Sequence, residues 1–225
     1  MSSASSKHPD PPEVSITRLG EVDSTNDYAL RRLASLPDRH IVAAEIQTGG
    51  KGRLDRSWVS TFPGNIYVSF VLKPEGRGPC PLANISQYLA LVVCEILEGR
   101  KVRPSLKWPN DVLVGDRKIA GILAQSNFFG DRLEGLVLGV GINLNLEDQD
   151  LRSIGRPAAS LNLLTGAPVD RDRFLEELAA RFFGGYDDFL AEGFPSIIEA
   201  YQARCLFLGK PIRVVLPDRE VMGTA

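Results

Sequence analysis

Three short apolar runs follow one another near the middle of the chain. They cover residues 112–114, 118–125 and 133–141, and only Gly115-Asp116 and Phe129-Gly130-Asp131 separate them. Glycine and aspartate between such runs are typical of tight turns, and a connection this short joins strands in antiparallel order. These segments therefore favour an antiparallel or mixed sheet.

The rest of the chain adds helices to this sheet. Further strands are predicted at 14–19, 41–46 and 65–72 and from Pro211 onward. Helices are predicted from Tyr28, where residues 23–26 supply capping side chains, and at 85–96, 174–186 and 197–203, where apolar residues recur at helical spacing. The expected fold class is α+β, a mixed β-sheet flanked by helices.

Composition excludes several functional classes. The chain has 225 residues, 44% of them hydrophobic, which supports one large domain. Its 26 basic and 28 acidic residues give a net charge of −2, so we expect no general nucleic-acid binding. No apolar run is long enough to span a bilayer, and the N-terminus lacks the apolar part of a signal peptide. Residues 1–13 are expected to be a disordered tail.

Cysteine and histidine usage points to no metal or nucleophilic site. Cys80, Cys94 and Cys205 cannot all pair and have no metal-binding spacing, which favours a reducing, cytoplasmic location. His8 lies in the tail and His40 beside a turn, and both are expected to face solvent. No Ser/His/Asp arrangement is suggested.

A glycine-rich segment with three cations runs from 47 to 58 and reads Gln-Thr-Gly-Gly-Lys-Gly-Arg-Leu-Asp-Arg-Ser-Trp. Its glycines let the backbone approach a ligand and turn N–H groups inward. Lys51, Arg53 and Arg56 suit a phosphate or carboxylate, and Trp58 offers a flat face for a ring such as adenine. The spacing is not that of a Walker A loop. A mobile basic surface loop beside a core tryptophan is the structural alternative.

A second polar segment surrounds a lysine. Residues 107–123 read Lys-Trp-Pro-Asn-Asp-Val-Leu-Val-Gly-Asp-Arg-Lys-Ile-Ala-Gly-Ile-Leu. An ammonium group at Lys118 can stabilise charge that develops on a phosphoryl group, and Gly121 would let the strand approach a ligand. The alternatives are an ordinary turn at 107–111 and an exposed lysine that leaves a hairpin.

Two more short segments have ordinary structural explanations. Ser24-Thr25-Asn26 supplies the residue types of a helix cap. Gly139-Val-Gly-Ile-Asn143 lies at a strand end, where Gly-x-Gly alone indicates a bulge or a turn more often than a site.

Together these segments resemble the signature of biotin protein ligases, enzymes that activate biotin with ATP and pass it to a lysine of an acceptor protein. The family pattern Gln-Thr-x-Gly-Arg-Gly-Arg-x-Gly-Arg-x-Trp is matched at Gln47, Thr48, Gly50, Gly52, Arg53, Arg56 and Trp58. Lys51 replaces the family's usual arginine, which keeps the charge and loses the bidentate fork, and Asp55 replaces a glycine. Segments 24–26, 107–111, 117–123 and 139–143 also match, and the resemblance extends over nearly all of the chain from about Val14.

The resemblance implies three sets of site residues. The catalytic candidates are Lys118, Arg53 and Asp111. The biotin-binding candidates are Ser24, Thr25, Asn26, Gln47, Gly50, Lys51, Lys118, Gly121 and Gly139. The candidates for binding ATP or the adenylate are Arg53, Arg56, Trp58 and Asn143. No residue is assigned as a direct metal ligand.

The resemblance also implies a role for each group. The hydroxyl and amide groups of residues 24–26, with Gln47, would bond the ureido ring of biotin, which needs donors and acceptors without charge. Lys118 would contact the biotin carboxylate and the α-phosphate, and Asp111 would orient the incoming lysine amine. The loop arginines would touch the phosphate as the loop closes over the intermediate.

The domain organisation implied is a catalytic domain followed by part of a second one. Residues 14–206 would form a mixed sheet similar to the core of class II aminoacyl-tRNA synthetases. Residues 207–225 resemble the first hairpin of the family's SH3-like C-terminal domain. Either that domain is truncated here, or the hairpin packs on the core by itself.

The function expected is formation of biotinyl-5′-adenylate from biotin and ATP, with Mg²⁺ beside the nucleotide. Biotin would then pass to a specific lysine of a biotin carboxyl carrier domain of a biotin-dependent carboxylase. The monofunctional type is expected, because only a short polar tail precedes Val14 and leaves no room for a DNA-binding domain. A lipoate–protein ligase, a biotin-responsive repressor and a biotin-binding protein without catalysis are the alternatives. The oligomeric state is left open, with a homodimer as one alternative.

Overall fold

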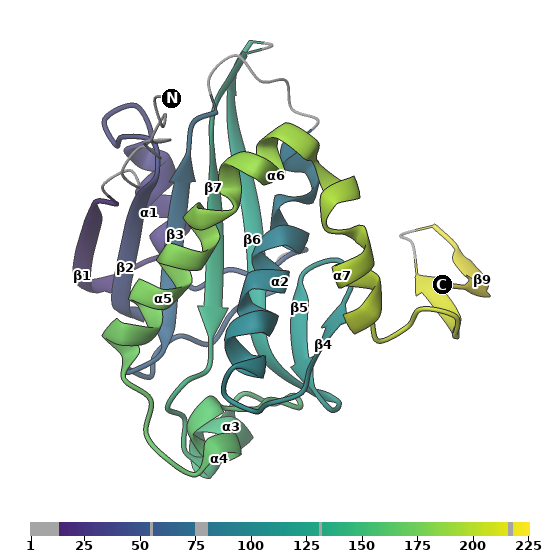
Figure 1. Cartoon of the computed structure of the whole chain (residues 1–225). Coiled ribbons are helices and arrows are strands. Elements are labelled where there is room, and N and C mark those ends of the chain that lie inside the picture. Colours follow the sequence, from purple (N-terminus) through teal and green to yellow (C-terminus); the bar gives the residue numbers. More distant parts are fainter. Residues whose placement is uncertain (1–13, 55, 75–80, 131, 216–217) are drawn as a thin grey trace, which may run out of the picture.

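A seven-stranded mixed sheet forms the centre of the molecule (Figure 1). The structure is a computed structural model, and it describes residues 14–54, 56–74, 81–130, 132–215 and 218–225. The strand order is β1-β2-β3-β7-β6-β5-β4; β1 and β2 run parallel and every other neighbouring pair is antiparallel. The strands are β1 (Ile16–Val22), β2 (His40–Gln47), β3 (Ile66–Leu72), β4 (Pro104–Lys107), β5 (Asp111–Val114), β6 (Arg117–Phe129) and β7 (Arg132–Ile142). The predicted α+β class is confirmed.

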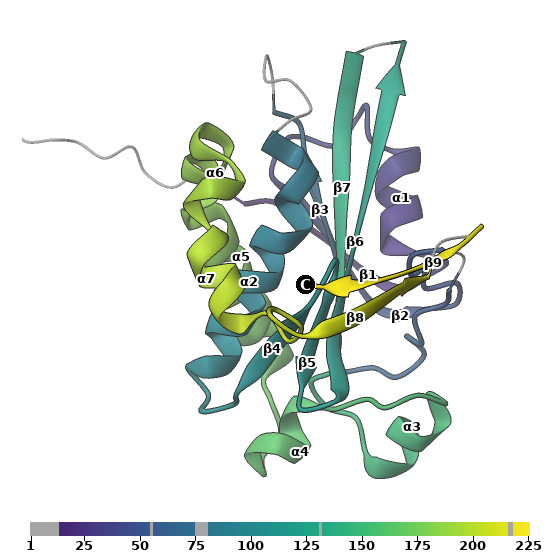
Figure 2. The same ribbon diagram turned by 90° about the vertical axis from the view of Figure 1, so that its right-hand side faces the viewer.

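Helices cover both faces of the sheet. They are α1 (Thr25–Arg31), α2 (Ile85–Glu98), α3 (Asp148–Ser153), α4 (Leu161–Thr165), α5 (Arg171–Gly184), α6 (Tyr186–Glu192) and α7 (Ile198–Arg204), with 3₁₀ turns at Pro81–Asn84 and Phe194–Ser196. Helix α1 lies alone on one face, while α2, α5 and α6 cover the other (Figure 2). No helix in the described part of the chain is long and apolar enough to cross a membrane.

The alternation of strand side chains divides the core in two. On β2 and β3, Ile41 and Phe70 belong to the large core, whereas Val42 and Val71 belong to a small cluster with Ala29 of α1. Every residue of β3 is buried because helices cover it on both sides, which explains its continuous apolar sequence. This double covering fixes α1, and therefore its N-terminal residues, against the middle of the sheet.

The sequence predictions miss the short elements. The segment 174–186 was expected to be one helix, and the chain instead forms α5 and α6, which are separated at Gly185. Strand β4 and helices α3 and α4 were not predicted. The tail expected at 1–13, together with Asp55, Cys80 and Asp131, lies outside the described residues.

The expectation that His40 faces solvent is wrong. His40 begins β2 and is only 6% exposed. Its ring nitrogens lie 2.7 Å from the Ser15 hydroxyl and 2.9 Å from the Thr17 hydroxyl, and burial lowers the pKa of the ring. The parallel pairing of β1 with β2 covers this position, and no local sequence pattern predicts that pairing.

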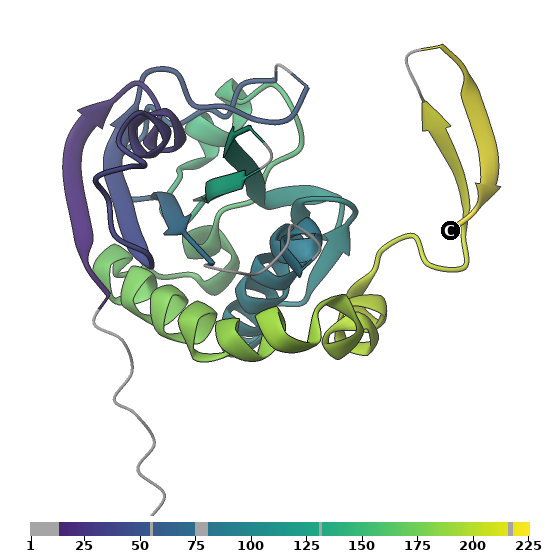
Figure 3. The same ribbon diagram turned by 90° about the horizontal axis from the view of Figure 1, so that it is seen from above.

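A hairpin follows the last helix, as the sequence predicts. Strands β8 (Pro211–Val215) and β9 (Glu220–Thr224) pair antiparallel with each other and stand beside the main sheet (Figure 3). Their apolar side chains stay exposed, 64% for Val215 and 70% for Met222. The backbone bond from Leu206 N–H to the Leu106 carbonyl, at 2.8 Å, ties the preceding segment to β4.

Candidate active site

One face of β7 carries the candidate site. Gly139 and Gly141 alternate along β7, and Asn143 follows the strand directly, so all three lie on the same side. A Cβ atom at Gly139 would lie 2.2 Å from Asn26 Oδ1, and one at Gly141 would lie 2.4 Å from the Trp58 ring. Both positions therefore need glycine. With about 3.3 Å per strand residue, the row from 139 to 143 spans roughly 13 Å.

A buried and uncharged polar cluster occupies the Gly139 end of this row. The Thr25 backbone N–H donates to Gln47 Oε1 at 2.8 Å, and Asn26 Nδ2 donates to Gln125 Oε1 at 2.8 Å. The Ser69 hydroxyl lies 2.8 Å from Thr25 Oγ1 and 2.6 Å from Asn26 Oδ1. The cluster is built from hydroxyl and amide groups alone, which can match a neutral polar ligand.

Helix α1 delivers this cluster to the sheet. Ser24 is its N-cap, and the Ser24 hydroxyl accepts from the Asp27 N–H at 3.4 Å. Residues 24–26 can therefore both cap the helix and contribute to the site, because only Ser24 acts as the cap. Thr25 and Asn26 belong to the polar cluster. Asp23 next to it pairs with Arg31 at 2.7 Å, which lowers the pKa of Asp23 to about 2.

The ammonium of Lys118 reaches the middle of the row, beside Gly121, which pairs with Gly141. This ammonium is 2.6 Å from Asp111 Oδ1 and 5.2 Å from the centre of the Trp58 ring. A Cβ atom at Gly121 would lie 2.9 Å from Lys118 Nζ, so the glycine makes room for the ammonium. Burial lowers the pKa of Lys118, and Asp111 opposes this shift.

The glycine-rich segment brings Trp58 onto the strand and leaves its arginines outside. The backbone N–H of Trp58 donates to the Gly50 carbonyl at 2.9 Å. A Cβ atom at Gly50 would lie 2.3 Å from the Ser60 hydroxyl. Lys51 pairs with Asp27 at 2.7 Å. Arg53 and Arg56 are exposed, and neither makes an ion pair within the described part of the chain, from which Asp55 is missing.

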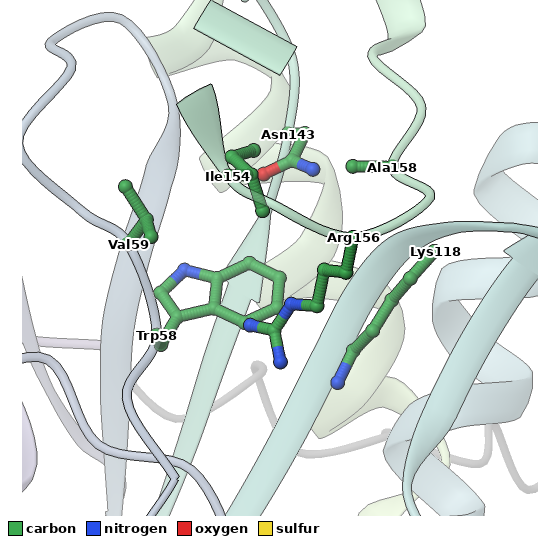
Figure 4. Close-up of a pocket in the computed structure, with 7 residues that line it drawn as sticks. All are labelled: Trp58, Val59, Lys118, Asn143, Ile154, Arg156 and Ala158. Atoms are coloured by element: carbon green, nitrogen blue, oxygen red, sulfur yellow. The ribbon is translucent and has the colours of Figure 1, made fainter. Parts of the chain in front are cut away.

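A small pocket closes the Asn143 end of the row (Figure 4). Its lining residues are Trp58, Val59, Lys118, Asn143, Ile154, Arg156 and Ala158. Asn143 Nδ2 donates to the Ala159 carbonyl at 3.0 Å, and Lys118 N–H donates to the Pro157 carbonyl at 3.1 Å. The segment after α3 is thereby fixed along the beginning of β6. The indole N–H of Trp58 is buried and finds no acceptor among the described residues.

The structure brings most of the predicted site residues together. Ser24, Thr25, Asn26, Gln47 and Gly139 form one end of the row, and Asp111, Lys118, Gly121, Trp58 and Asn143 form the middle and the other end. Gly50 lies against the backbone carbonyl of Trp58, Lys51 pairs with Asp27, and Arg53 and Arg56 are exposed.

Sequence reasoning missed four contributors: Ser69, Gln125, Gly141 and Arg156. Gly141 stood within the segment 139–143, so its alternation with Gly139 was the available signal. Ser69 lies inside an apolar run, and its isolated hydroxyl was a weak signal. Nothing around Gln125 or Arg156 in the sequence marks them, because long-range backbone pairing brings them in.

No group of three or more His, Cys, Asp or Glu side chains that could hold a metal ion occurs among the described residues. Lys118 and Arg156 line the pocket and Asp111 pairs with Lys118, so cations outnumber carboxylates there, which suits an anionic ligand.

The chain is similar in sequence to known proteins of one family. A model of the biotin/lipoate A/B protein ligase family matches residues 19–143. The biotin–[acetyl-CoA-carboxylase] ligase of Paracoccus denitrificans is 36% identical over 199 residues, which cover 86% of this chain and 82% of that protein. The bifunctional ligase/repressor BirA of Escherichia coli is 30% identical over 213 residues, 93% of this chain. This chain spans only 65% of the length of that bifunctional protein.

A solved structure shows the same fold. The biotin protein ligase from Aquifex aeolicus in complex with biotin and ATP superposes with a TM-score of 0.76 at 28% identity, and covers 93% of this chain and 86% of that chain.

Proposed function

This chain belongs to the biotin/lipoate A/B protein ligase family, and we propose from that premise that it is a biotin protein ligase. A biotin carboxylate oxygen attacks the α-phosphorus of ATP, the bond to the β-phosphate oxygen breaks, and pyrophosphate leaves. A lysine amine of the acceptor then attacks the acyl carbon of biotinyl-5′-adenylate. AMP leaves, and the amine nitrogen loses a proton as the amide forms.

The observation that carries this proposal is the order of groups along β7. An uncharged polar cluster at Gly139 is followed by the ammonium of Lys118 near Gly141 and then by the pocket at Asn143. Biotin has the same order, because a neutral urea ring leads through an apolar chain to a carboxylate, which is where the nucleotide joins. The polar cluster supports biotin over a dithiolane acid, which has no urea to bond.

Lys118 and Asp111 are proposed as the reacting pair. The ammonium stabilises the negative charge that develops at the α-phosphate and holds the biotin carboxylate in place. In the second step Asp111 orients the acceptor amine. Its carboxylate already binds one ammonium, that of Lys118, and would exchange it for the amine of the acceptor lysine. Arg53 and Arg56 act on the phosphate after the loop that carries them closes.

Magnesium accompanies the nucleotide in this proposal. No group of three or more His, Cys, Asp or Glu side chains among the described residues could hold the ion, and no residue is proposed as its direct ligand. When bound with the nucleotide, Mg²⁺ would neutralise part of the triphosphate charge and assist the departure of pyrophosphate.

The acceptor is proposed to be the biotin carboxyl carrier domain of a biotin-dependent carboxylase, a reaction of the cytoplasm. The relative from Paracoccus denitrificans is named a biotin–[acetyl-CoA-carboxylase] ligase, which supports this choice. A homodimer is compatible with the function, and sedimentation of the purified protein with and without biotin measures it.

Pyrophosphate release tests the function directly. The purified protein is mixed with ATP, Mg²⁺ and either biotin or lipoate, and pyrophosphate is measured with and without a carrier domain. We expect release with biotin and none above background with lipoate, and a biotinylated carrier lysine identified by mass spectrometry. Release with lipoate instead would make the chain a lipoate ligase, and binding of biotin without any release would leave it a binding protein.

A further inference from the structure

Arg156 brings a guanidinium group into the candidate site from a segment with no motif. It follows Gly155, which has a left-handed backbone with φ of 70°, and precedes Pro157. Its Nη2 donates to the Ser57 carbonyl at 3.2 Å, and its guanidinium carbon lies 5.9 Å from the centre of the Trp58 ring. The Arg156 side chain extends across the indole with the Lys118 side chain beside it (Figure 4).

The position of this segment is fixed by the backbone. Lys118 N–H donates to the Pro157 carbonyl at 3.1 Å, and Ala159 N–H donates to the Lys118 carbonyl at 2.9 Å. The backbone at Arg156 therefore cannot move away from Lys118 without breaking the pairing between its own segment and β6, and the bond to Ser57 holds the side chain. Arg156 is a built part of the pocket wall rather than a free surface side chain.

The charges at this end of the row are unbalanced. Asp111 pairs with Lys118, but Arg156 makes no ion pair among the described residues, and no acidic side chain lines the pocket. Two cations that converge on one pocket repel each other, and an anion between them removes that repulsion. The place of Arg156 beside Lys118 in the pocket wall is therefore suited to an anionic ligand.

The place of Arg156 along the row decides which anion it meets. Arg156 shares the pocket with Asn143, whereas the uncharged cluster lies at Gly139, roughly 13 Å away along the strand. Lys118 stands between the two ends, where the carboxylate and the α-phosphate must meet. The group beyond Lys118 therefore belongs to the nucleotide and not to biotin.

We propose that Arg156 is a nucleotide-binding residue that contacts the phosphates of ATP from beside the glycine-rich segment, which it touches at Ser57. This inference rests on the proposed function. It adds Arg156 to the cations of the nucleotide site, although residue 156 lies outside the segments that match the family pattern. The planar fork of arginine can bond two phosphate oxygens while it keeps its contact with the Trp58 ring.

Substitution separates this role from mere support of the loop. Arg156→Ala should raise the KM for ATP by roughly tenfold or more, which is the usual scale for loss of a charge-assisted hydrogen bond. The KM for biotin should stay within about twofold, because biotin's ring binds at the other end of the row. Arg156→Lys keeps the charge without the planar fork, and its KM for ATP should lie between those of the wild type and Arg156→Ala. Arg152→Ala, an exposed arginine on α3, is the matched control and should change neither constant.

Direct binding keeps the test independent of catalysis. Calorimetry with ATP alone and with inorganic pyrophosphate should show the same loss of affinity in Arg156→Ala, with thermal unfolding as a check on folding. If that variant is unfolded, Arg156→Lys and Arg156→Gln decide the question. Unchanged affinity for both anions, or an equal loss of ATP and biotin binding, would overturn the proposal. A wild-type protein that binds ATP but releases no pyrophosphate refutes the proposed function, while the calorimetry still decides the role of Arg156.

Discussion

Lys118 experiences two opposing effects. Burial beside Trp58 lowers the pKa of its ammonium below the usual value near 10.5, and the carboxylate of Asp111 at 2.6 Å holds the proton on. An ammonium that is partly removed from water interacts more strongly with a phosphate than a solvated one does. In the proposed mechanism, Asp111 would therefore act before any acceptor arrives, since it favours the charged form of Lys118.

The pH dependence of adenylate formation should report this balance. The reactive ammonium is lost as pH rises through the pKa of Lys118, so activity falls on the alkaline side. Asp111→Asn removes the group that raises this pKa, and we expect the alkaline limb to move to lower pH, measured as pyrophosphate release against pH. Asp116→Asn in the β5–β6 turn is the control and should leave the limb in place.

The lysine itself can be tested more simply. Lys118→Ala should reduce adenylate formation by about two to three orders of magnitude, the usual effect of removing one preorganised charge contact. Its far-ultraviolet circular dichroism should match the wild type. Undiminished pyrophosphate release from a folded Lys118→Ala protein would remove this residue from the mechanism.

Strand β7 organises the site at the scale of elements. Its glycines at 139 and 141 let α1 and the glycine-rich segment place side chains directly on the backbone of the sheet. The same face of the strand carries Val137 in the small core under α1. One strand face therefore changes along its length from a packing surface to the surface that carries the candidate site.

Alanine at these two glycines should have separable effects. Gly139→Ala displaces Asn26 and should weaken biotin binding more than ATP binding, whereas Gly141→Ala displaces Trp58 and should weaken ATP binding. Calorimetry with each ligand measures both. Gly20→Ala on β1 meets no atom within 4 Å and serves as the control. The reverse pattern of losses would contradict the order of groups along β7.

The glycine-rich segment should be accessible to protease without ligand. Arg53 and Arg56 are exposed, and three neighbouring glycines favour an unfolded alternative. Trypsin should cleave after these arginines quickly in the free protein and slowly with biotin and ATP together, as followed by mass spectrometry. Equal rates in both states would mean that the segment does not close over this pair of ligands.

The elements predicted from sequence were those with local signals. The turn at Gly115-Asp116 and the run 65–72 identify their structures through a few adjacent residues. Strand β4 is four residues long and begins with proline, so neither alternation nor length revealed it. The site followed the same rule: residues 24–26 stood out by type, while Arg156 is brought in by backbone bonds to Lys118, which no local pattern encodes.

At the scale of the whole molecule, the C-terminal hairpin stands apart from the core. Strands β8 and β9 expose the side chains of Val215 and Met222. An isolated two-stranded hairpin has only marginal stability in water. Deletion of residues 210–225 should therefore lower the midpoint of thermal unfolding by less than about 2 °C, because little apolar surface of the core is uncovered. Calorimetric unfolding of both forms measures it. A larger drop would show that the hairpin stabilises the sheet.

The linear order of groups along β7 makes the fit of a substrate depend on the distance between its ring and its acid group. A substrate that anchors its ring at Gly139 brings its far end to Lys118 only if its chain spans the pleats between them, each pair of residues contributing about 7 Å. For a biotin ligase, an analogue with the correct ring and a shorter or longer tail binds with its acid group out of register with the ammonium. Under the proposed function, selection would therefore depend on the span of the acid as well as on the chemistry of its ring.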